Sequence, residues 1–530
     1  MAEFTEKQTT GEKLYHPELR TLVETARFHA GRQPGSPAIL FEGSTTTYGQ
    51  LHEESNRIAH AIRATGAAPG TRVAYLGKES AHYYEILFGC AKSGTVLVPI
   101  NWRLTAHEVS HILQDSGTEL LFLEEEFAPV VDRLPDGPPT TVVRLGAPEG
   151  FAAWKAAHPA TEPEVDAGPD TPLAQIYTSG TTGLPKGVVL AHRSCFAIRD
   201  ALASEGLEWI DWRTGDVALV GIPGFHVGGL WWATQNFNAG VTVVVMRAFA
   251  AHTAVELIRE LGVTTACVVP AMLRLMLAEP GITPEHFTTL RKIVYGGSPI
   301  SESLLEESLA MFGSEFAQIY GLTETGNTAC CLPPHAHVPG SPLMKAAGHP
   351  YPGVRAKVID ADGRELPTGA VGEVCLHTPA RMVEYWGLPG KTAETLVDGW
   401  IHTGDAGYID EDGYVFISDR IKDAVIVAGE NVYPAEIENA LEAHPGVADA
   451  VVVGAPDERW GETLHAFIVP APGHQPTPRD LHRFLAGRLA SFKLPAAYEF
   501  IDEVPRNPSG KILRRELRER FWSGSDRKVN

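Results

Sequence analysis

The sequence predicts an α/β protein: a large N-terminal region of packed α/β subdomains with a small β subdomain, followed by a small, mobile α+β domain. Three observations support this fold class. Strand and helix patterns alternate up to about residue 350, Asp-Gly turn signals follow, and the last hundred or so residues mix strands with helices. Alternation of this kind is typical of βαβ units in a mostly parallel sheet.

The first alternating stretch lies near the N-terminus. Residues 51–66 have the apolar spacing of a helix, and residues 72–80 and 96–101 have the pattern of strands. Proline and glycine then become frequent between Pro135 and Pro172. That composition predicts a loop-rich stretch that separates two subdomains.

Four later segments repeat one theme, in which an apolar strand runs into a turn marked by Gly or Pro and then into a helix. They begin at Leu173, Val217, Thr265 and Lys292. In parallel sheets, ligands bind at the carboxyl ends of the strands, where these turns lie. We therefore expect the functional site along this edge.

Two Asp-Gly pairs, at residues 362–363 and 412–413, signal tight hairpins and predict the small antiparallel β subdomain. The pattern changes back to α+β after Arg420. We place the domain boundary there, which gives an N-terminal domain of residues 1–420 and a C-terminal domain of residues 421–530.

The composition disfavours two classes of partner. Of 530 residues, 44% are hydrophobic and 21% are charged, as in ordinary globular proteins. Lys and Arg total 44 against 65 Asp and Glu, and the net charge of −21 disfavours nonspecific binding to nucleic acid or to an anionic membrane. Small anionic ligands remain compatible with this charge, because local loops can hold them.

The cysteines and the apolar runs predict a soluble cytoplasmic protein. Six cysteines without a Cys-x-x-Cys pair do not make a disulfide framework, so we expect free thiols. No apolar run reaches the ~20 residues of a membrane-spanning helix, and the N-terminal residues lack the apolar segment of a signal peptide. The oligomeric state stays open, with a homodimer as one alternative.

The strongest local signal is the segment YTSGTTGLPKG at residues 177–187. Its glycines let the backbone approach a ligand, its hydroxyl side chains add donors, and Lys186 supplies a point charge for phosphate. It is not a Walker A loop, because Pro185 stands where that motif has glycine, and it is not a GxGxxG fingerprint. We favour a nucleotide phosphate loop over a plain surface loop.

Six further motifs accompany this loop: TYGQL at 47–51, YGGSPI at 295–300, QIYGLTET at 318–325, GWIHTGDAGYID at 399–410, DRIKDAVIVAGENVYP at 419–434 and PRNPSGKILRREL at 505–517. Together they resemble the adenylate-forming (ANL) superfamily of acyl- and aryl-CoA synthetases, peptide-synthetase adenylation domains and firefly-type luciferases. The resemblance covers nearly the whole chain and points to the acyl-CoA synthetase, or fatty-acid–CoA ligase, branch. It implies that residues 1–420 form an AMP-binding adenylation domain.

The reaction implied by the resemblance has two halves. A carboxylate attacks the α-phosphorus of ATP and gives an acyl adenylate and pyrophosphate, and a thiol then attacks the acyl carbon and releases AMP. In the first half an anion approaches a polyanion, so cations and dipoles must be preorganised around the phosphates. We expect Lys186, Arg420 and Lys511 to supply this local charge in an acidic chain.

The resemblance assigns roles to residues of each motif. Lys511 bridges the substrate carboxylate and the α-phosphate, Thr323 contacts the α-phosphate, and Glu324 holds Mg²⁺, for which a single carboxylate is suitable. Tyr320 stacks on adenine, with a buried structural tyrosine as the alternative. Nucleotide contacts are also implied for Thr178, Ser179, Gly180, Thr181, Thr182, Gly183, Lys186, Gly297, Ser298 and Gln318.

Two further roles concern the ribose and the hinge. Asp405 and Arg420 are expected to contact the ribose, since a carboxylate can accept hydrogen bonds from both hydroxyls. Lys422, two residues after Arg420, is expected to be the hinge about which the C-terminal domain swings. The swing would withdraw Lys511 and bring the Gly429 segment to the thioester site.

The segment 223–229 resembles the border of the acyl pocket in related CoA ligases, and His226 is expected to gate that pocket. The alternative is a structural histidine in the core whose ring nitrogens have hydrogen-bond partners. No aspartate follows in LWWATQNFNAG, where amino-acid-activating relatives usually carry one, so we expect an acid without an α-amino group. Trp231, Trp232 and Phe237 either line the pocket or belong to the core.

The sequence thus predicts an acid–thiol ligase that uses ATP, Mg²⁺ and coenzyme A, with a fatty acid as the expected substrate. Coenzyme A is the expected acceptor because no carrier domain is appended after Lys511. The alternatives are an aryl acid of the coumarate or benzoate kind, and a carrier-protein thiol as acceptor. An inactive nucleotide-binding relative is a third, and Lys511, Glu324, Asp405 and Lys186 are evidence against it.

Overall fold

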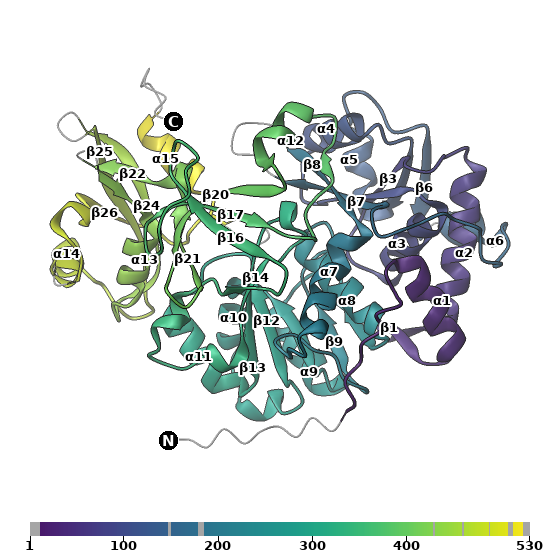
Figure 1. Cartoon of the computed structure of the whole chain (residues 1–530), viewed down its shortest axis with the longest axis horizontal. Helices are drawn as coiled ribbons and strands as arrows, with labels where there is room; N and C mark the ends of the chain where they lie inside the picture. The colour runs from purple at the N-terminus through teal and green to yellow at the C-terminus, as the bar shows by residue number, and fades with distance from the viewer. Residues whose placement is uncertain are drawn as a thin grey trace.

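The computed structural model describes residues 11–146, 150–178, 185–427, 430–457, 461–486, 488–506 and 512–522. Within these ranges the strands form four sheets, of nine, seven, five and five strands. The two large sheets and their helices make up most of the body in Figure 1, and the C-terminal elements lie at one side of it. The predicted α/β fold class is confirmed.

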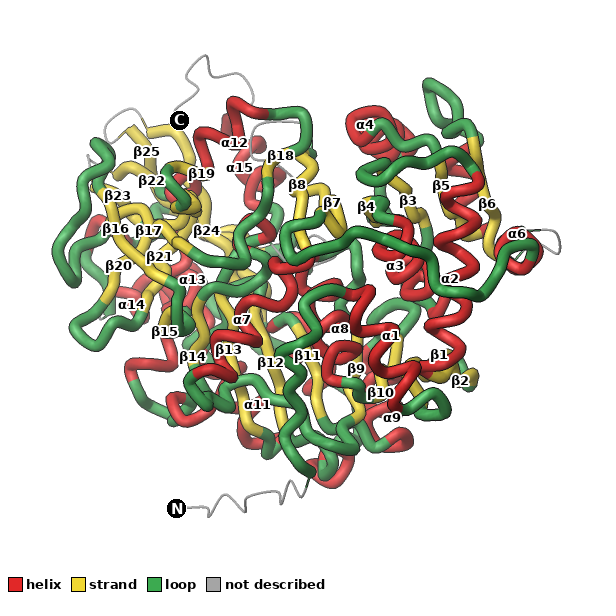
Figure 2. The backbone as a smooth tube through the Cα atoms, turned by 45° about the vertical axis from the view of Figure 1, so that its right-hand side comes forward, coloured by secondary structure: helices red, strands yellow, loops and turns green. Residues whose placement is uncertain are grey.

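The nine-stranded sheet has the order β15-β14-β13-β12-β11-β9-β10-β1-β2, and most of its strands can be followed side by side in Figure 2. Every neighbouring pair from β13 to β1 is parallel, and the pairs at both edges are antiparallel. The bounds are β1 Pro37–Phe41, β2 Ser44–Thr47, β9 Val217–Val220, β10 Thr242–Val245, β11 Thr265–Val268, β12 Lys292–Gly296, β13 Glu315–Tyr320, β14 Cys330–Leu332 and β15 His349–Pro350.

The seven-stranded sheet has the order β18-β8-β7-β4-β3-β5-β6. Its central strands are parallel and fully buried, as expected where helices cover both faces. The bounds are β3 Arg72–Leu76, β4 Val96–Ile100, β5 Leu120–Glu124, β6 Thr141–Leu145, β7 Pro172–Thr178, β8 Lys186–Ala191 and β18 Glu384–Tyr385.

Two details of this sheet differ from the sequence prediction. The helix expected directly after β7 is preceded by β8, which pairs antiparallel with β7, because the apolar run of residues 188–191 is buried in the sheet. The stretch 135–172 does not separate two subdomains. It contains β6 and a short helix, and β6 and β7 belong to the same sheet.

Helices cover both large sheets. Helix α3 contacts β4 of one sheet and β1 of the other, and its residues are buried from Tyr83 to Ser93. A helix that lies between two sheets needs apolar residues on all its faces, unlike a surface helix. The helices of this region are α1 Leu22–Arg32, α2 Tyr48–Ala64, α3 Ala81–Ser93, α4 Ala106–Ser116, α5 Ala128–Val131, α6 Phe151–Ala156, α7 His192–Ser204, α8 Val227–Ala239, α9 Ala251–Leu261, α10 Pro270–Leu277, α11 Glu302–Phe312 and α12 Pro389–Thr395.

The predicted antiparallel β subdomain is present as a five-stranded sheet. All its pairs are antiparallel, and the Asp412-Gly413 pair forms the turn between two of its strands, with Gly413 at a φ of 83°. That conformation strongly favours glycine. The bounds are β16 Arg355–Ile359, β17 Gly372–His377, β19 Leu396–Val397, β20 Trp400–Ile409 and β21 Val415–Arg420.

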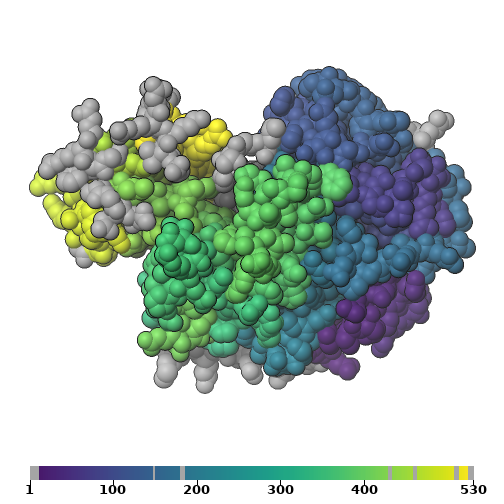
Figure 3. All heavy atoms as spheres, turned by 45° about the horizontal axis from the view of Figure 1, so that its top comes forward, coloured from purple at the N-terminus to yellow at the C-terminus, as the bar shows by residue number. Residues whose placement is uncertain are grey.

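The C-terminal elements have a hydrophobic core of their own, which includes Val425, Ile437, Leu441 and Leu481. Figure 3 shows them as a lobe, yellow-green to yellow, beside the larger body. The bounds are β22 Val425–Val427, β23 Glu430–Val432, β24 Val447–Asp457, β25 Gly461–Pro470, β26 Ala497–Phe500, α13 Pro434–Glu442, α14 Pro478–Ala486 and α15 Arg514–Trp522.

Two predictions about the chain as a whole can be compared with the structure. The six cysteines are buried and free, as expected. Among the described residues, no helix combines the length and the apolar character that are needed to cross a bilayer.

Candidate active site

A cavity of about 820 Å³ lies where the carboxyl ends of β11, β12 and β13 meet the β7–β8 hairpin and the end of β21. This is the edge of the parallel sheet at which ligands are expected. Predicted residues that line it are Thr178, Lys186, His226, Gly297, Thr323, Glu324, Arg420 and Lys422. The predicted residues Ser179, Gly180, Thr181, Thr182, Gly183, Gly429 and Lys511 lie outside the described part of the chain.

The β7–β8 hairpin positions Lys186 at one wall of the cavity. Thr178 and Lys186 are paired across the hairpin, so they stand at the two ends of the predicted phosphate loop. The Lys186 ammonium lies 4.1 Å from the centroid of the Tyr385 ring. No carboxylate of the described residues forms a salt bridge with Lys186. Its charge is therefore available to an anion in the cavity.

Thr323 and Glu324 belong to η3, a 3₁₀ helix of residues Thr323–Thr325 that follows β13. The Tyr385 hydroxyl donates to Glu324 Oε1 at 2.6 Å, and burial together with the Glu324 charge raises the pKa of Tyr385. Among the described residues, no donor bonds to Glu324 Oε2. One free carboxylate oxygen in a cavity fits Mg²⁺, which usually binds one or two carboxylates, phosphates and waters.

Tyr385 is a site residue that sequence reasoning missed. It lies on β18, 61 residues from Glu324, and contacts both Glu324 and Lys186. No local pattern around it indicates a ligand site. Only the pairing of β18 with β8, which places Tyr385 opposite Val188, brings it to the cavity.

Asp405 and Arg420, both predicted to contact ribose, are brought together by the pairing of β20 with β21. Arg420 Nε lies 2.9 Å from Asp405 Oδ1, and the Tyr320 hydroxyl donates to Asp405 Oδ2 at 2.7 Å. Burial raises the pKa of Tyr320 well above its ordinary value, so this hydroxyl is a donor at neutral pH. The structure thus joins Tyr320, Asp405 and Arg420 in one hydrogen-bonded group.

The remaining predicted nucleotide residues are not among the residues that line the cavity. Gln318 accepts a hydrogen bond from the Tyr295 hydroxyl at 2.9 Å, and Ser298 donates to the Pro299 carbonyl. Of the residues of β13, Ile319 lines the cavity, whereas its neighbours Gln318 and Tyr320 do not.

His226 occupies the N-cap position of α8, without a side-chain capping hydrogen bond, and it lines the cavity. Burial, with a smaller effect from Arg103, lowers its pKa to about 4. The imidazole is therefore neutral at physiological pH. Trp231, Trp232 and Phe237 are buried in the main core and do not line this cavity.

The segment that carries His226 is fixed by two residues that sequence reasoning missed. The Gly224 N–H donates to Glu79 Oε1 at 2.6 Å, and the Tyr83 hydroxyl donates to the Gly224 carbonyl at 3.1 Å. Burial raises the pKa of Glu79 to about 7. A Cβ at position 224 would lie 2.4 Å from the Tyr83 hydroxyl, so this close contact requires glycine.

The predicted hinge residue Lys422 lies in η6, a 3₁₀ helix of residues Ile421–Asp423 between β21 and β22. It lines the cavity, and burial lowers its pKa. The segment therefore links the last strand of the antiparallel sheet to the first strand of the C-terminal lobe. It contributes to the wall of the cavity as well.

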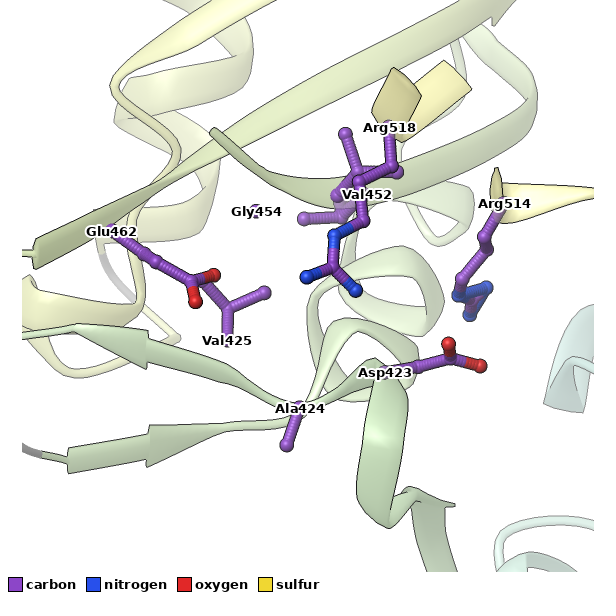
Figure 4. Close-up of a pocket in the computed structure, with 9 residues that line it drawn as sticks. Asp423, Ala424, Val425, Val452, Gly454, Glu462, Arg514 and Arg518 are labelled. Carbon is purple, nitrogen blue, oxygen red and sulfur yellow. The ribbon is translucent and has the colours of Figure 1, made fainter. Parts of the chain in front are cut away.

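Arg514 connects the C-terminal lobe to the strand before the hinge. Its guanidinium lies 2.6 Å from Glu438 of α13 and 4.0 Å from Asp419 of β21. Figure 4 shows Arg514 and Arg518, both on α15, pointing toward the segment that follows the hinge. Burial raises the pKa of Glu438 to about 7, although Arg514 opposes this. The junction thus contains a buried, charged group of three side chains.

Comparison with known proteins decides the family. A family model described as AMP-binding enzyme matches residues 26–386, and one described as AMP-binding enzyme C-terminal domain matches residues 436–511. The chain belongs to the AMP-binding enzyme family. This confirms the resemblance to adenylate-forming enzymes, and it identifies the protein as an acid–thiol ligase that uses ATP.

Three relatives of this AMP-binding enzyme are informative. It is 78% identical to the fatty acid–[acyl-carrier-protein] ligase ScoC of Streptomyces coeruleorubidus, over 98% of this chain and 100% of that one. It is 38% identical to the long-chain-fatty-acid–CoA ligase FadD13 of Mycobacterium tuberculosis, over 90% and 93%. The crystal structure of ATP-bound MatB from Rhodopseudomonas palustris has a TM-score of 0.85 at 30% identity, over 94% and 99%.

Proposed function

We propose that this enzyme adenylates a fatty acid and transfers the acyl group to the thiol of an acyl-carrier protein. The observation that carries the proposal is the 78% identity, over essentially the whole chain, to a fatty acid–[acyl-carrier-protein] ligase. The coenzyme A expected from the sequence is the alternative acceptor, supported by the 38% identical long-chain-fatty-acid–CoA ligase.

The two candidate acceptors differ only outside the cavity. Coenzyme A and a carrier protein present the same phosphopantetheine thiol, and they differ in what stands at the far end of that arm. A nucleotide or a protein surface would therefore be recognised outside the cavity. We therefore base the choice of a carrier protein on overall similarity to a carrier-protein ligase rather than on any one cavity residue.

In the first half-reaction we assign the ATP phosphates to the loop after β7, to Lys186 and to Thr323. The acid carboxylate attacks the α-phosphorus, a new P–O bond forms, and pyrophosphate leaves. Glu324 would hold Mg²⁺ through its free oxygen, and the ion would neutralise phosphate charge. Asp405 would accept from the ribose hydroxyls, with Arg420 orienting its carboxylate.

In the second half-reaction the carrier thiol attacks the acyl carbon, the acyl C–O bond to phosphate breaks, and AMP leaves. We propose that rotation about Lys422 separates the two halves, so that Lys511 serves the first and the Gly429 segment serves the second. His226 is neutral at physiological pH. It would border the acid without adding charge to the site.

The test measures both products with one acid. A medium-chain fatty acid, ATP and Mg²⁺ are incubated with the enzyme, and pyrophosphate release is followed. Acyl transfer is then compared between a holo-acyl-carrier protein, its apo form as a matched control, and coenzyme A. We expect the highest kcat/KM with the holo carrier and no transfer to the apo form. An equal or higher kcat/KM with coenzyme A would overturn the carrier proposal and favour the CoA ligase.

A further inference from the structure

One end of the cavity is apolar and contains two buried polar atoms without a partner. Ile222, Val227, Cys267 and Val268 are among the apolar residues that line the cavity. His226 Nε2 and Asn327 Nδ2 are buried and make no hydrogen bond with the described residues. Buried polar groups almost always have partners. Ten buried side-chain atoms of the described residues lack a partner, and these two belong to residues that line one cavity. Their place in the cavity makes them the candidates for bonding to a ligand.

Asn327 is held in an unusual backbone conformation. Its φ of 89° lies in the left-handed region, which asparagine tolerates better than most residues. Its N–H donates to the Leu322 carbonyl at 3.0 Å, which closes the turn that contains Thr323 and Glu324. Strained conformations of this kind concentrate at functional sites. The turn fixes where the Asn327 amide lies.

The Asn327 amide lies against the first turn of α8, a helix of 13 residues. A Cβ built at Gly228 would lie 3.5 Å from Asn327 Oδ1 and 3.7 Å from Ile222 Cδ1. The backbone N–H groups of Val227 and Gly228 have no acceptor among the described residues. The N-terminus of a helix favours negative charge and hydrogen-bond acceptors.

These groups share one chemical character. Asn327 Nδ2 and the two N–H groups of α8 are donors without a partner among the described residues, and Ile222 and Val227 are apolar neighbours in the same cavity lining. A ligand atom that satisfies them must accept hydrogen bonds. Thr323 and Glu324, where the carboxylate reacts in the proposed function, are four and three residues before Asn327 in a short turn. Asn327 is therefore placed to meet carbons close to the carboxyl group.

We propose that the natural acid carries a hydrogen-bond acceptor on one of its first few carbons, and that Asn327, at the N-terminus of α8, selects it. The proposal rests on the proposed function, since it names the class of acid that the same cavity activates. The substituent class includes a hydroxyl, a carbonyl or another small acceptor. An unsubstituted chain leaves the amide unpaired.

The experiment compares acids with an eight-carbon main chain that differ in the kind and position of one substituent. Octanoic, 3-hydroxyoctanoic, 3-methyloctanoic and 8-hydroxyoctanoic acids are assayed by pyrophosphate release. The methyl group matches the hydroxyl in size but cannot accept a hydrogen bond. We expect kcat/KM for the 3-hydroxy acid to exceed that for the 3-methyl acid by about tenfold or more. The reason is that the methyl group leaves the hydrogen-bond donors of the site without a partner. The 8-hydroxy acid should show no such advantage.

Two variants test the residue. Asn327→Gly tolerates a positive φ and removes the amide donor, so it should lower the ratio of 3-hydroxy to 3-methyl acid several-fold. Asn327→Asp also tolerates a positive φ but keeps an acceptor for the hydroxyl of the acid, so it should lower the ratio less. Asn439→Asp, on the exposed side of α13, is the matched control and should keep the wild-type ratio. Thermal melting checks that the variants are folded.

The outcomes separate this inference from the proposed function. If the wild-type enzyme activates fatty acids but gives equal kcat/KM for the 3-hydroxy and 3-methyl acids, the inference is overturned and the proposed function stands. If the Asn327 variants lower the rates with all acids equally, Asn327 supports the carboxyl group or the fold, and the inference is also overturned. If no fatty acid is activated, the proposed function fails and the inference fails with it.

Discussion

Tyr385 offers a sharp test of the assigned site, because one substitution separates its two contacts. Its hydroxyl donates to Glu324 Oε1 at 2.6 Å, and its ring centroid lies 4.1 Å from the Lys186 ammonium. Tyr385→Phe removes the hydroxyl and keeps the ring. We expect the Glu324 carboxylate to lose its fixed orientation while Lys186 keeps its position.

The size of the effect follows from two estimates. A hydrogen bond to a charged group contributes about 1.5–3 kcal/mol. Removing a group that orients a metal-binding carboxylate changes metal affinity typically 10–100-fold, which corresponds to about 1.4–2.7 kcal/mol. The two ranges overlap. The variant should therefore need roughly 10–100-fold more Mg²⁺ for half-maximal adenylation.

The assay is pyrophosphate exchange with a saturating acid, titrated with Mg²⁺ at fixed free ATP. Tyr414→Phe is a suitable control, because Tyr414 lies in the antiparallel β subdomain and does not line the cavity. It should leave the Mg²⁺ dependence unchanged. If Tyr385→Phe lowers kcat but keeps the wild-type Mg²⁺ midpoint, Glu324 is not oriented for a metal ion and the assignment is refuted.

Three further predictions can be tested, and the first rests on the sequence resemblance because Lys511 lies outside the described residues. Lys511→Ala should abolish adenylation and largely spare thioester formation from supplied acyl adenylate; equal loss of both, in single-turnover assays, would contradict its role. Asp211→Asn leaves buried Arg291 and Lys292 without their shared carboxylate. Urea unfolding should therefore show a free energy of unfolding that is lower by about 3–5 kcal/mol. A decrease below about 1 kcal/mol would contradict this prediction. Burial raises the pKa of Glu79 from 4.5 to about 7, so its contribution to stability is present below pH 4.5 and is lost as pH rises through 7. Between pH 4.5 and 7.5 the free energy of unfolding of the wild type should therefore fall by about 3 kcal/mol relative to that of Glu79→Gln. A difference between the two free energies that does not vary with pH would refute this prediction.

Much of the fold could be predicted because its strands carry strong local signals. The apolar runs at β9, β11 and β12 end in glycine or proline turns, and their carboxyl ends do form one wall of the cavity. The β7–β8 hairpin was not predicted, because an apolar run of six residues after a loop can equally begin a helix. The pairing of β8 with β7 is local, whereas the other neighbour of β8 in the sheet, β18, lies far away in the sequence.

The residues of the candidate site likewise fall into those that local motifs predict and those that distant contacts bring in. Residues within motifs, such as Lys186, Glu324 and Arg420, could be named because the chemistry of each motif is local. Tyr385 and Glu79 could not, because they act on partners 61 and 145 positions away. Their own surroundings in the sequence are unremarkable in composition. Contacts of this kind are set by sheet pairing and helix packing, which single-sequence patterns do not specify.

The structure also changes which cations can serve the phosphates. The sequence suggested Lys186, Arg420 and Lys511 as the local positive charge in a chain of net charge −21. Arg420 is already bonded to Asp405 at 2.9 Å and to the Thr403 carbonyl at 2.9 Å, so its charge is compensated within the protein. Its role is then to orient Asp405, whereas Lys186 and Lys422, which also line the cavity, form no salt bridge with a carboxylate of the described residues. On this basis, neutralising Lys186 should impair ATP use more than replacing Arg420 by lysine, which preserves the charge but loses the paired geometry.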